Sequence, residues 1–323
     1  EDDFGKSKQI EKATVKHFLN RTWEDFKFAK EEDIFKPVKT QLTKKKLLEL
    51  GDKLSTLPEG KKYFRKIVKL MKDRKSAIEE SKLDWGSAEM LAYATLLEEG
   101  HSVRISGQDV ERGTFSHRHA VIITEDAEEE VVTLNNISDK QAEFTIYNSL
   151  LSEYGVLGFE YGYSFAVPKG LTIWEAQFGD FSNGAQIMVD QFIVAAEDKW
   201  GVSNGLVILL PHGYEDMGSE HSSGRIERFL QQCADNNMQI VNCTTPANHY
   251  HVLRRQIKRN FRKPLIAFSP KKLLRYPKAV SSLDEIAKGS FQEVMDDTSV
   301  NKKDVKTVAL CSGKIYYDII EQK

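Results

Sequence analysis

The sequence predicts an α/β protein whose mostly parallel sheet is covered by helices on both faces. Between residues 84 and 270, short runs rich in Val, Ile and Leu alternate with longer segments whose apolar residues repeat at the helical period. The run at 206–210 is apolar at every position, which is typical of a strand buried on both faces. With 323 residues, of which 40% are hydrophobic and 29% charged, the composition is that of a globular protein of about two domains.

Residues 1–82 are predicted to form a basic helical arm or linker. They carry 22 Lys and Arg residues against 15 Asp and Glu, a net charge of +7, whereas the rest of the chain has a net charge of −9. Apolar residues at helical spacing interleave with the lysines of 61–72, and acidic residues are interspersed throughout the arm. This pattern favours a solvated helix face over a nucleic-acid-binding surface, and 55–60 is expected to hold a turn or a new helix start.

Residues 83–286 are predicted to form the α/β body. Its helices are expected at 85–97, 152–165, 185–196, 223–236 and 247–260. Its strands are expected at 102–106, 144–147, 172–176, 206–210, 239–243 and 265–268, with a hairpin of 120–124 and 131–134. After a polar stretch, 287–323 is expected to begin a second α/β domain with a strand at 305–310 and a helix at 314–321. Because the chain lacks an initiator Met and stops in mid-pattern, we expect it to be a piece of a longer protein.

Several classes of site and location are disfavoured. The sequence has no G-x-G-x-x-G loop, no P-loop and no G-x-S-x-G nucleophile elbow. The histidine pairs in 117–119 and 249–251 lack further ligands at zinc spacing, so we expect structural or substrate-facing histidines rather than metal ligands. The three cysteines have no CxxC spacing, which favours a reduced compartment. The apolar runs are far shorter than the roughly 20 residues of a membrane span, and no targeting peptide is visible.

The most informative segment is 147–228. It contains YNSLLSEYGVLGFEYG at 147–162, IWEAQFGDF at 173–181, LPHGYE at 210–215 and EHSSGRIER at 220–228. Further motifs are RGTF at 112–115, HRH at 117–119, LRRQ at 253–256, SPK at 269–271 and SGKIYY at 312–317. From about residue 54 onward, this series resembles the thiamine diphosphate-dependent decarboxylating first component of the 2-oxoglutarate dehydrogenase complex. The resemblance implies the transketolase-like fold of its pyrimidine-binding domain.

The resemblance implies a role for Glu153 as the catalytic carboxylate. In the family, a glutamate at the matching position hydrogen-bonds a ring nitrogen of the aminopyrimidine and favours the imino form that activates the thiazolium. Tyr154, Val156, Leu157 and Phe159 flank Glu153, so we expect its carboxyl group to be desolvated. From the residues alone, a carboxylate near a helix start is an ordinary capping feature, and only the resemblance reverses that interpretation.

Other positions are matched to the cofactor and the substrate. Gln177, Phe178 and Phe181 match a loop that lines the pyrimidine pocket, where an amide and aromatic faces suit a planar heterocycle. His221 matches a substrate-facing histidine suited to proton transfer or to stabilising a developing oxyanion. His117 and His119 are weaker substrate candidates, and the sequence does not distinguish between them.

The resemblance also says what this chain lacks. The family binds Mg²⁺ through a Gly-Asp-Gly motif and a downstream Asn on a different domain, and neither 51–53 nor 179–181 fits that motif. We therefore expect no metal ligands here and no activity from this chain alone. For the complete enzyme, the resemblance implies a homodimer that passes a succinyl group to a lipoyl-bearing dihydrolipoyl succinyltransferase. It also implies a bacterial cytoplasmic or mitochondrial matrix location, with no nucleic acid or membrane partner.

Two alternatives stay open at this point. One is another thiamine enzyme, such as a 2-oxoadipate or pyruvate dehydrogenase component or a transketolase. The other, of a different class, is a non-catalytic interaction module in which the basic arm docks a partner.

Overall fold

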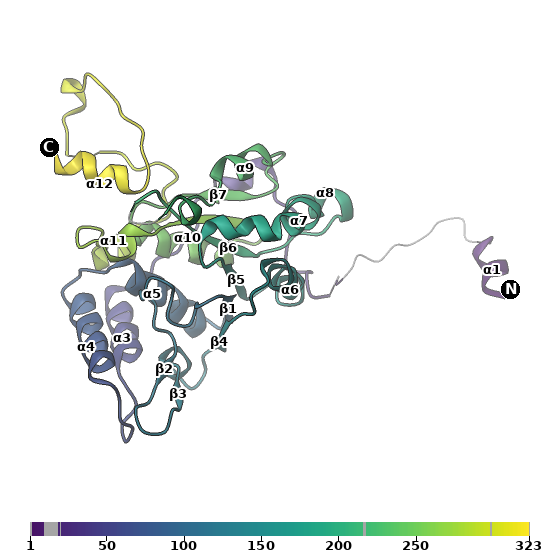
Figure 1. Ribbon diagram of the computed structural model, residues 1–323. Coiled ribbons are helices and arrows are strands. Elements are labelled where there is room, and N and C mark those ends of the chain that lie inside the picture. Colours follow the sequence, from purple (N-terminus) through teal and green to yellow (C-terminus); the bar gives the residue numbers. More distant parts are fainter. Residues whose placement is uncertain (1, 10–18, 20, 216–217, 298, 323) are drawn as a thin grey trace.

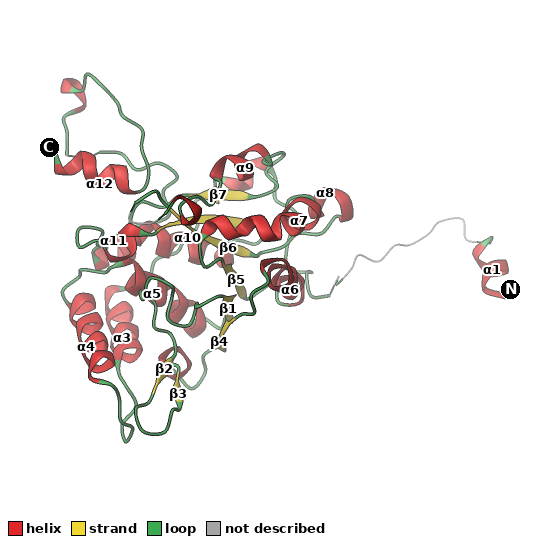
Figure 2. Cartoon of the chain, viewed as in Figure 1, coloured by secondary structure: helices red, strands yellow, loops and turns green. Residues whose placement is uncertain are grey.

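The computed structural model describes residues 2–9, 19, 21–215, 218–297 and 299–322 (Figure 1). A six-stranded sheet at its centre has the strand order β4-β1-β5-β6-β8-β7 (Figure 2). Its strands are β1 (Val103–Gly107), β4 (Phe144–Asn148), β5 (Leu171–Glu175), β6 (Val207–His212), β7 (Gln239–Val241) and β8 (Leu265–Pro270). Every neighbouring pair is parallel. The predicted α/β class with a mostly parallel sheet is therefore confirmed.

Helices cover both faces of the sheet. One face carries α3 (Lys44–Ser55), α5 (Trp85–Glu98), α10 (Pro246–Lys258) and α11 (Leu283–Lys288). The other face carries α6 (Glu153–Ala166), α7 (Gln186–Met188), α8 (Ala196–Trp200) and α9 (Ile226–Gln231). The outlying helices are α1 (Asp2–Ser7), α2 (Glu31–Ile34), α4 (Arg65–Glu79) and α12 (Lys314–Glu321). Single-turn 3₁₀ segments lie at Thr133–Asn136, Ser219–His221, Lys272–Arg275 and Lys302–Asp304, and a longer one spans Gly179–Ala185.

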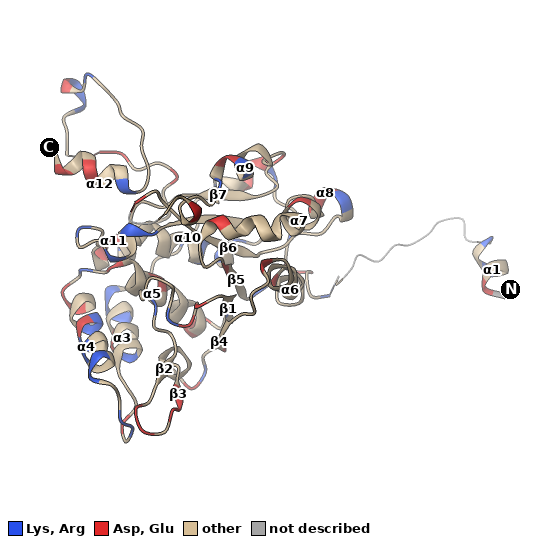
Figure 3. Cartoon of the chain, viewed as in Figure 1, with Lys and Arg blue, Asp and Glu red and all other residues tan. Residues whose placement is uncertain are grey.

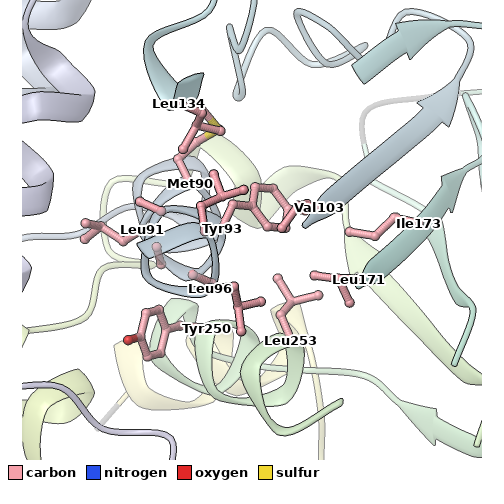
Figure 4. Close-up of a cluster of buried hydrophobic side chains, with 14 of the residues drawn as sticks. Met90, Leu91, Tyr93, Leu96, Val103, Leu134, Leu171, Ile173, Tyr250 and Leu253 are labelled. Carbon is pink, nitrogen blue, oxygen red and sulfur yellow. The ribbon is translucent and has the colours of Figure 1, made fainter. Parts of the chain in front are cut away.

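The pleat of the strands sends neighbouring side chains into two separate cores. Ile173 belongs to the core shared with α5 and α10, whereas the next residue, Trp174, belongs to the core shared with α6. Ile208 of β6 also lies in the second core, between two residues of the first. Figure 4 shows side chains of β5, α5 and α10 gathered in the first core. This alternation is why the central strands are apolar at consecutive positions.

The basic N-terminal segment contributes to the first core. Leu47, Leu50 and Leu54 of α3 are fully buried in it, while most Lys and Arg residues of α3 and α4 lie on the outer side (Figure 3). Arg74 of α4 is the exception, because it is buried and donates to the carbonyl oxygen of Arg118 at 2.6 Å. Trp23 donates a hydrogen bond from Nε1 to the carbonyl oxygen of Phe165, 2.9 Å away. Residues 10–18 of the predicted arm lie outside the described residues. The division of the chain at 82/83 and 286/287 stays a prediction.

Three predicted elements are shorter or more broken than expected. The hairpin contains only β2 (Ile122–Ile123) and β3 (Glu130–Val131), which are antiparallel. The helix expected at 185–196 is interrupted by a π segment at Val189–Ile193. The helix expected at 223–236 is reduced to α9. Arg225 has a φ of +58°, which prevents an earlier helix start, and Asp235 and Asn236 have φ values of +49° and +58°, which exclude an α-helix at the other end.

The strand expected at 305–310 is wrong, whereas the helix after it, α12, is confirmed. Val308 and Leu310 are 78% and 87% exposed. A strand needs a neighbour to satisfy its backbone groups, and the sheet of the described residues does not extend to this segment. Among the helices of the described residues, none is long and apolar enough to cross a membrane.

Candidate functional site

The predicted site residues gather at the carboxyl ends of the strands. Gln177 and Phe178 lie two and three residues after the end of β5, and His212 is the last residue of β6. The chain returns to the same place at His221, in the 3₁₀ turn before α9. Ligands of open α/β sheets bind in the crevice outside these strand ends.

An aromatic cluster of Phe115, Phe178, Phe181 and His221 forms the centre of the site. Phe178 is buried, and its ring centroid lies 4.4 Å from that of His221. The ring of Phe181 lies 6.0 Å from Phe178 and 5.5 Å from His221. Phe115 meets Phe178 edge-on at 5.8 Å. The structure therefore brings together two predicted cofactor residues and one predicted catalytic residue.

Two loop backbones touch beneath this cluster. A Cβ atom on Gly179 would lie 2.7 Å from the carbonyl oxygen of Pro211 and 2.8 Å from Cα of Gly224. Only glycine fits such a close approach. This contact fixes the spacing between the loop that carries Phe178 and the loop that carries His221.

Glu153 lies at the edge of the same site, as the first residue of α6. Its helix begins there because the Ser152 side chain accepts a hydrogen bond from the amide of Gly155. Gln108 donates from Nε2 to Glu153 Oε1 at 3.0 Å. A Cβ atom on Gly184 would lie 3.3 Å from Glu153 Oε2, so the carboxylate lies against the 3₁₀ segment that contains Phe181.

The surroundings of Glu153 are only partly apolar. Leu157 is buried, but Tyr154 and Phe159 are 50% and 60% exposed. The side chain of Glu153 is half-buried in this chain. Gln177 is also half-buried, next to Phe178. The expected desolvation by Tyr154 and Phe159 is therefore incomplete within the described residues.

His117 and His119 are held differently from His221. Burial, followed by the charge of Arg118, lowers the pKa of His117 to about 3. The ring of His117 lies 6.4 Å from Phe115, and its Nδ1 atom is buried without a hydrogen-bond partner. Burial and then the charge of Arg74 lower the pKa of His119, whose φ is +48°. His117 is therefore neutral near pH 7, and the low pKa of His119 also favours its neutral form.

A buried ion cluster of Glu89, Arg118, Glu175 and His249 lies beside the site. Arg118 is fully buried and donates from Nε to Glu89 Oε1 at 2.7 Å and from Nη1 to Glu175 Oε1 at 3.1 Å. His249 Nε2 lies 3.2 Å from Glu89 Oε2. Burial alone would raise the pKa of Glu89, but Arg118 and His249 hold it well below its ordinary value. Burial raises the pKa of Glu175.

This ion cluster explains a group of residues that resembles a metal site. One ligand atom each of Glu89, His117 and Glu175 lies within 4.8 Å of the other two. The guanidinium of Arg118 binds both carboxylates, so a cation of the protein itself already occupies this place. The described residues offer no other such group of three.

Four residues of the site were given no role from the sequence: Gln108, Phe115, His212 and Lys271, the last three of which lie within the motifs RGTF, LPHGYE and SPK. Gln108 and Lys271 directly follow β1 and β8, and His212 ends β6. The rule that polar residues after parallel strands converge at one edge could have found these three. No signal in the sequence indicated that Phe115 would contact Phe178.

Comparisons with known proteins agree with this geometry. The model of the family "Transketolase, pyrimidine binding domain" matches residues 81–277, and that of "2-oxoglutarate dehydrogenase C-terminal" matches residues 280–323. The chain is similar to proteins named 2-oxoglutarate dehydrogenase E1 component. It is 52% identical to the one from Haemophilus influenzae over 89% of this chain and 31% of that protein. The relatives from Cupriavidus necator and Brucella anthropi are 50% and 47% identical over 95% and 100% of this chain.

The chain spans about a third of the length of these relatives. The resemblance read from the motifs at 147–228 is confirmed. Because the transketolase model matches more than half of the residues and the fold is the expected α/β architecture, the chain belongs to the transketolase pyrimidine-binding domain family.

Proposed function

We propose that this chain supplies the pyrimidine-binding part of a thiamine diphosphate-dependent enzyme that decarboxylates 2-oxoglutarate. The observation that carries the proposal is the position of Glu153 against the segment of Phe181, beside the aromatic cluster at the strand ends. The names of the relatives support the choice of 2-oxoglutarate as substrate.

The residues of the site fit a thiamine pyrimidine ring. A carboxylate at Glu153, an amide at Gln177 and the rings of Phe178 and Phe181 are the donor, acceptor and aromatic groups that a planar aminopyrimidine requires. Asp180 Oδ2 is buried without a hydrogen-bond partner beside this cluster. A buried polar atom in this state calls for a partner from a ligand or from another chain.

Each side chain has a role in the proposed reaction. Thiamine diphosphate, when bound, supplies the carbon nucleophile that adds to a 2-oxo acid. Glu153 would share a proton with the pyrimidine nitrogen, while Gln108 orients its carboxylate through Oε1. Glu220 accepts from His221 Nδ1 at 3.1 Å, so His221 would present Nε2 to the substrate. Once Nε2 is protonated as well, it would donate to developing negative charge. His117 would act as a neutral hydrogen-bonding group.

The finer parts of the proposal concern the whole enzyme. Mg²⁺ would bind on a part of the protein outside this chain, because both carboxylates of the one candidate group among the described residues, Glu89 and Glu175, are bound to Arg118. A homodimer is supported by exposed apolar residues around Glu153, including Leu150 and Leu151 at 83% and 84% exposure. A lipoyl-bearing dihydrolipoyl succinyltransferase would accept the succinyl group. Because the relatives are bacterial, the enzyme to which this chain belongs would be located in the cytoplasm.

The test is Glu153→Ala in the full-length protein. We expect decarboxylation of 2-oxoglutarate to be abolished, because cofactor activation precedes every later step. Glu153→Gln keeps a hydrogen-bonding group but cannot share the proton, so we expect at most slight activity. Glu143→Ala, at an exposed position away from the site, is the control.

Carbon dioxide release should be followed with 2-oxoglutarate, 2-oxoadipate and pyruvate in parallel. Near-normal turnover of Glu153→Ala would contradict the role of Glu153. Preference of the wild-type protein for another 2-oxo acid would contradict the substrate assignment while keeping the reaction class.

A further inference from the structure

We propose that Lys271 is a positioning residue, which holds His221 against Phe178 through a buried ammonium group. This inference rests on the proposed function, because it assigns a residue that acts through His221. It adds a role for the carboxyl end of β8, to which the resemblance of the motifs assigns no function.

Lys271 is built into the sheet rather than onto the surface. It follows β8 directly, and its backbone amide donates to the carbonyl oxygen of His212 at 3.4 Å, which continues the β6–β8 pairing by one step. The residue is only 5% exposed. A lysine is rarely buried to this degree unless its ammonium group is hydrogen-bonded.

The ammonium group reaches across to the loop that carries His221. Lys271 Nζ donates a hydrogen bond to the backbone carbonyl oxygen of His221, fifty residues earlier in the chain. The bond is to the main chain, so it fixes where the residue sits and leaves the imidazole ring available to the site. The ring then lies 4.4 Å from Phe178.

The remaining contacts hold the rest of this loop, residues 218–224, from other sides. The amide of Gly224 donates to His212 Nδ1 at 3.1 Å, which requires the neutral ring of His212 with its proton on Nε2. Burial lowers the pKa of His212 and favours this neutral form. Ser222 Oγ donates to the carbonyl oxygen of Gly218 at 2.7 Å. His221 itself is held by its amide, which donates to the carbonyl oxygen of Gly218 at 3.0 Å, and by Lys271, which ties its carbonyl oxygen to the end of β8.

A charged group in this place can act on catalysis without touching the substrate. Misplacing a catalytic group by about 1 Å can lower a rate by about a hundredfold. If Lys271 acts only by placing His221, its removal lowers kcat and leaves KM and cofactor affinity nearly unchanged. A direct contact with the substrate carboxylate would instead raise KM.

The experiment uses the full-length enzyme with thiamine diphosphate and Mg²⁺. Lys271→Met keeps the length and apolar stem of the side chain and removes its charge, and Lys271→Arg keeps the charge. Lys278→Met is the matched control, because Lys278 is exposed and its partner is Glu321. We expect kcat to fall by about ten- to about a hundredfold in Lys271→Met, to recover in part in Lys271→Arg, and to stay unchanged in Lys278→Met.

The combination with His221→Ala gives the sharpest result. We expect Lys271→Met to have almost no further effect in a His221→Ala background, because a residue that acts through His221 has nothing left to position. Additive losses in the double variant would overturn the proposal, as would an increase in KM with unchanged kcat.

Hydrogen exchange separates this proposal from the function on which it rests. We expect faster exchange of the amides of 218–224 in Lys271→Met than in Lys278→Met, with or without activity. Inactivity of the wild-type enzyme on every 2-oxo acid would defeat the proposed function alone. Unchanged exchange in Lys271→Met, or in Lys271→Gln if the first variant does not fold, would defeat the positioning role.

Discussion

Two regions that meet at the carboxyl end of β5 both contain acidic residues and histidines, and they differ in how their charges are satisfied. In the ion cluster, the carboxylates of Glu89 and Glu175 are bound by Arg118 within the chain. In the candidate site, Glu153 and His221 are only partly buried, and His221 lies against the ring of Phe178. Internal pairing marks the first region as structural, while the half-buried acid and base of the second suit an external ligand.

The largest effect that we expect on stability comes from breaking the ion cluster. Arg118→Met would leave two buried carboxylates without a cation, and we expect a loss of about 3–5 kcal/mol in the free energy of unfolding. Urea unfolding monitored by circular dichroism measures this change in the free energy of unfolding. Adding Glu89→Gln and Glu175→Gln should restore most of the loss, because no charge then remains unpaired. An unchanged midpoint in Arg118→Met would remove the basis for calling this region structural.

The corresponding change in the candidate site acts on rate. His221→Asn in the full-length enzyme should lower kcat by about 10²–10³-fold, the usual effect of losing one donor to a developing oxyanion. Because His221 is half-buried on a loop, we expect little change in stability or in cofactor affinity. Lost cofactor binding with unchanged turnover per bound cofactor would make His221 a cofactor or structural residue instead.

A pair of glutamates on α6 tests the comparison within one helix. Glu160 is buried, and Arg104 donates to both of its carboxylate oxygens, at 2.8 Å and 2.9 Å. We expect Glu160→Gln to lower the free energy of unfolding by about 1.5–3 kcal/mol, because a charged hydrogen-bond pair is broken. Glu153→Gln should leave the unfolding midpoint unchanged while it removes activity. Equal losses of stability in the two variants would show that both glutamates are structural.

The smallest expected effect is on pH dependence. The pKa of His117 falls from 6.5 to about 3 in the folded chain, so protonation favours the unfolded state. The stability that depends on neutral His117 is complete above about pH 6.5 and is lost as the pH falls toward 3. As the pH falls through that window, the free energy of unfolding of the wild-type protein should decrease faster than that of His117→Gln. The difference between the two slopes should reach up to about 1.4 kcal/mol per pH unit.

Unfolding midpoints at pH 7.0 and 5.5 for the two proteins measure this difference. His119 and His212 also have lowered pKa values, but they are present in both proteins and cancel. Parallel pH curves for wild type and His117→Gln would show that His117 is not held neutral by the fold.

Prediction from the sequence succeeded where local pattern and burial agree. The six strands of the sheet and helices α5, α6 and α10 were predicted within a few residues, because each is apolar at its own period. Prediction failed at 305–310, whose Val and Leu residues suit a strand but pair with no strand of the part of the chain that the structure describes. It also failed at 223–236, where the left-handed conformations of Arg225, Asp235 and Asn236 exclude a helix on both sides of α9. In both cases backbone pairing or geometry outweighed side-chain preference.

The sequence by itself determined the α/β class, the family and the positions of Glu153, Phe178 and His221 in the motifs. Only the tertiary structure decided which charges are neutralised inside the chain. Arg118 meets Glu89 and Glu175 from positions 29 and 57 residues apart. Lys271 meets His221 across fifty residues. Side chains so distant in sequence find each other only after the parallel strands have aligned their ends, and no local pattern encodes that meeting.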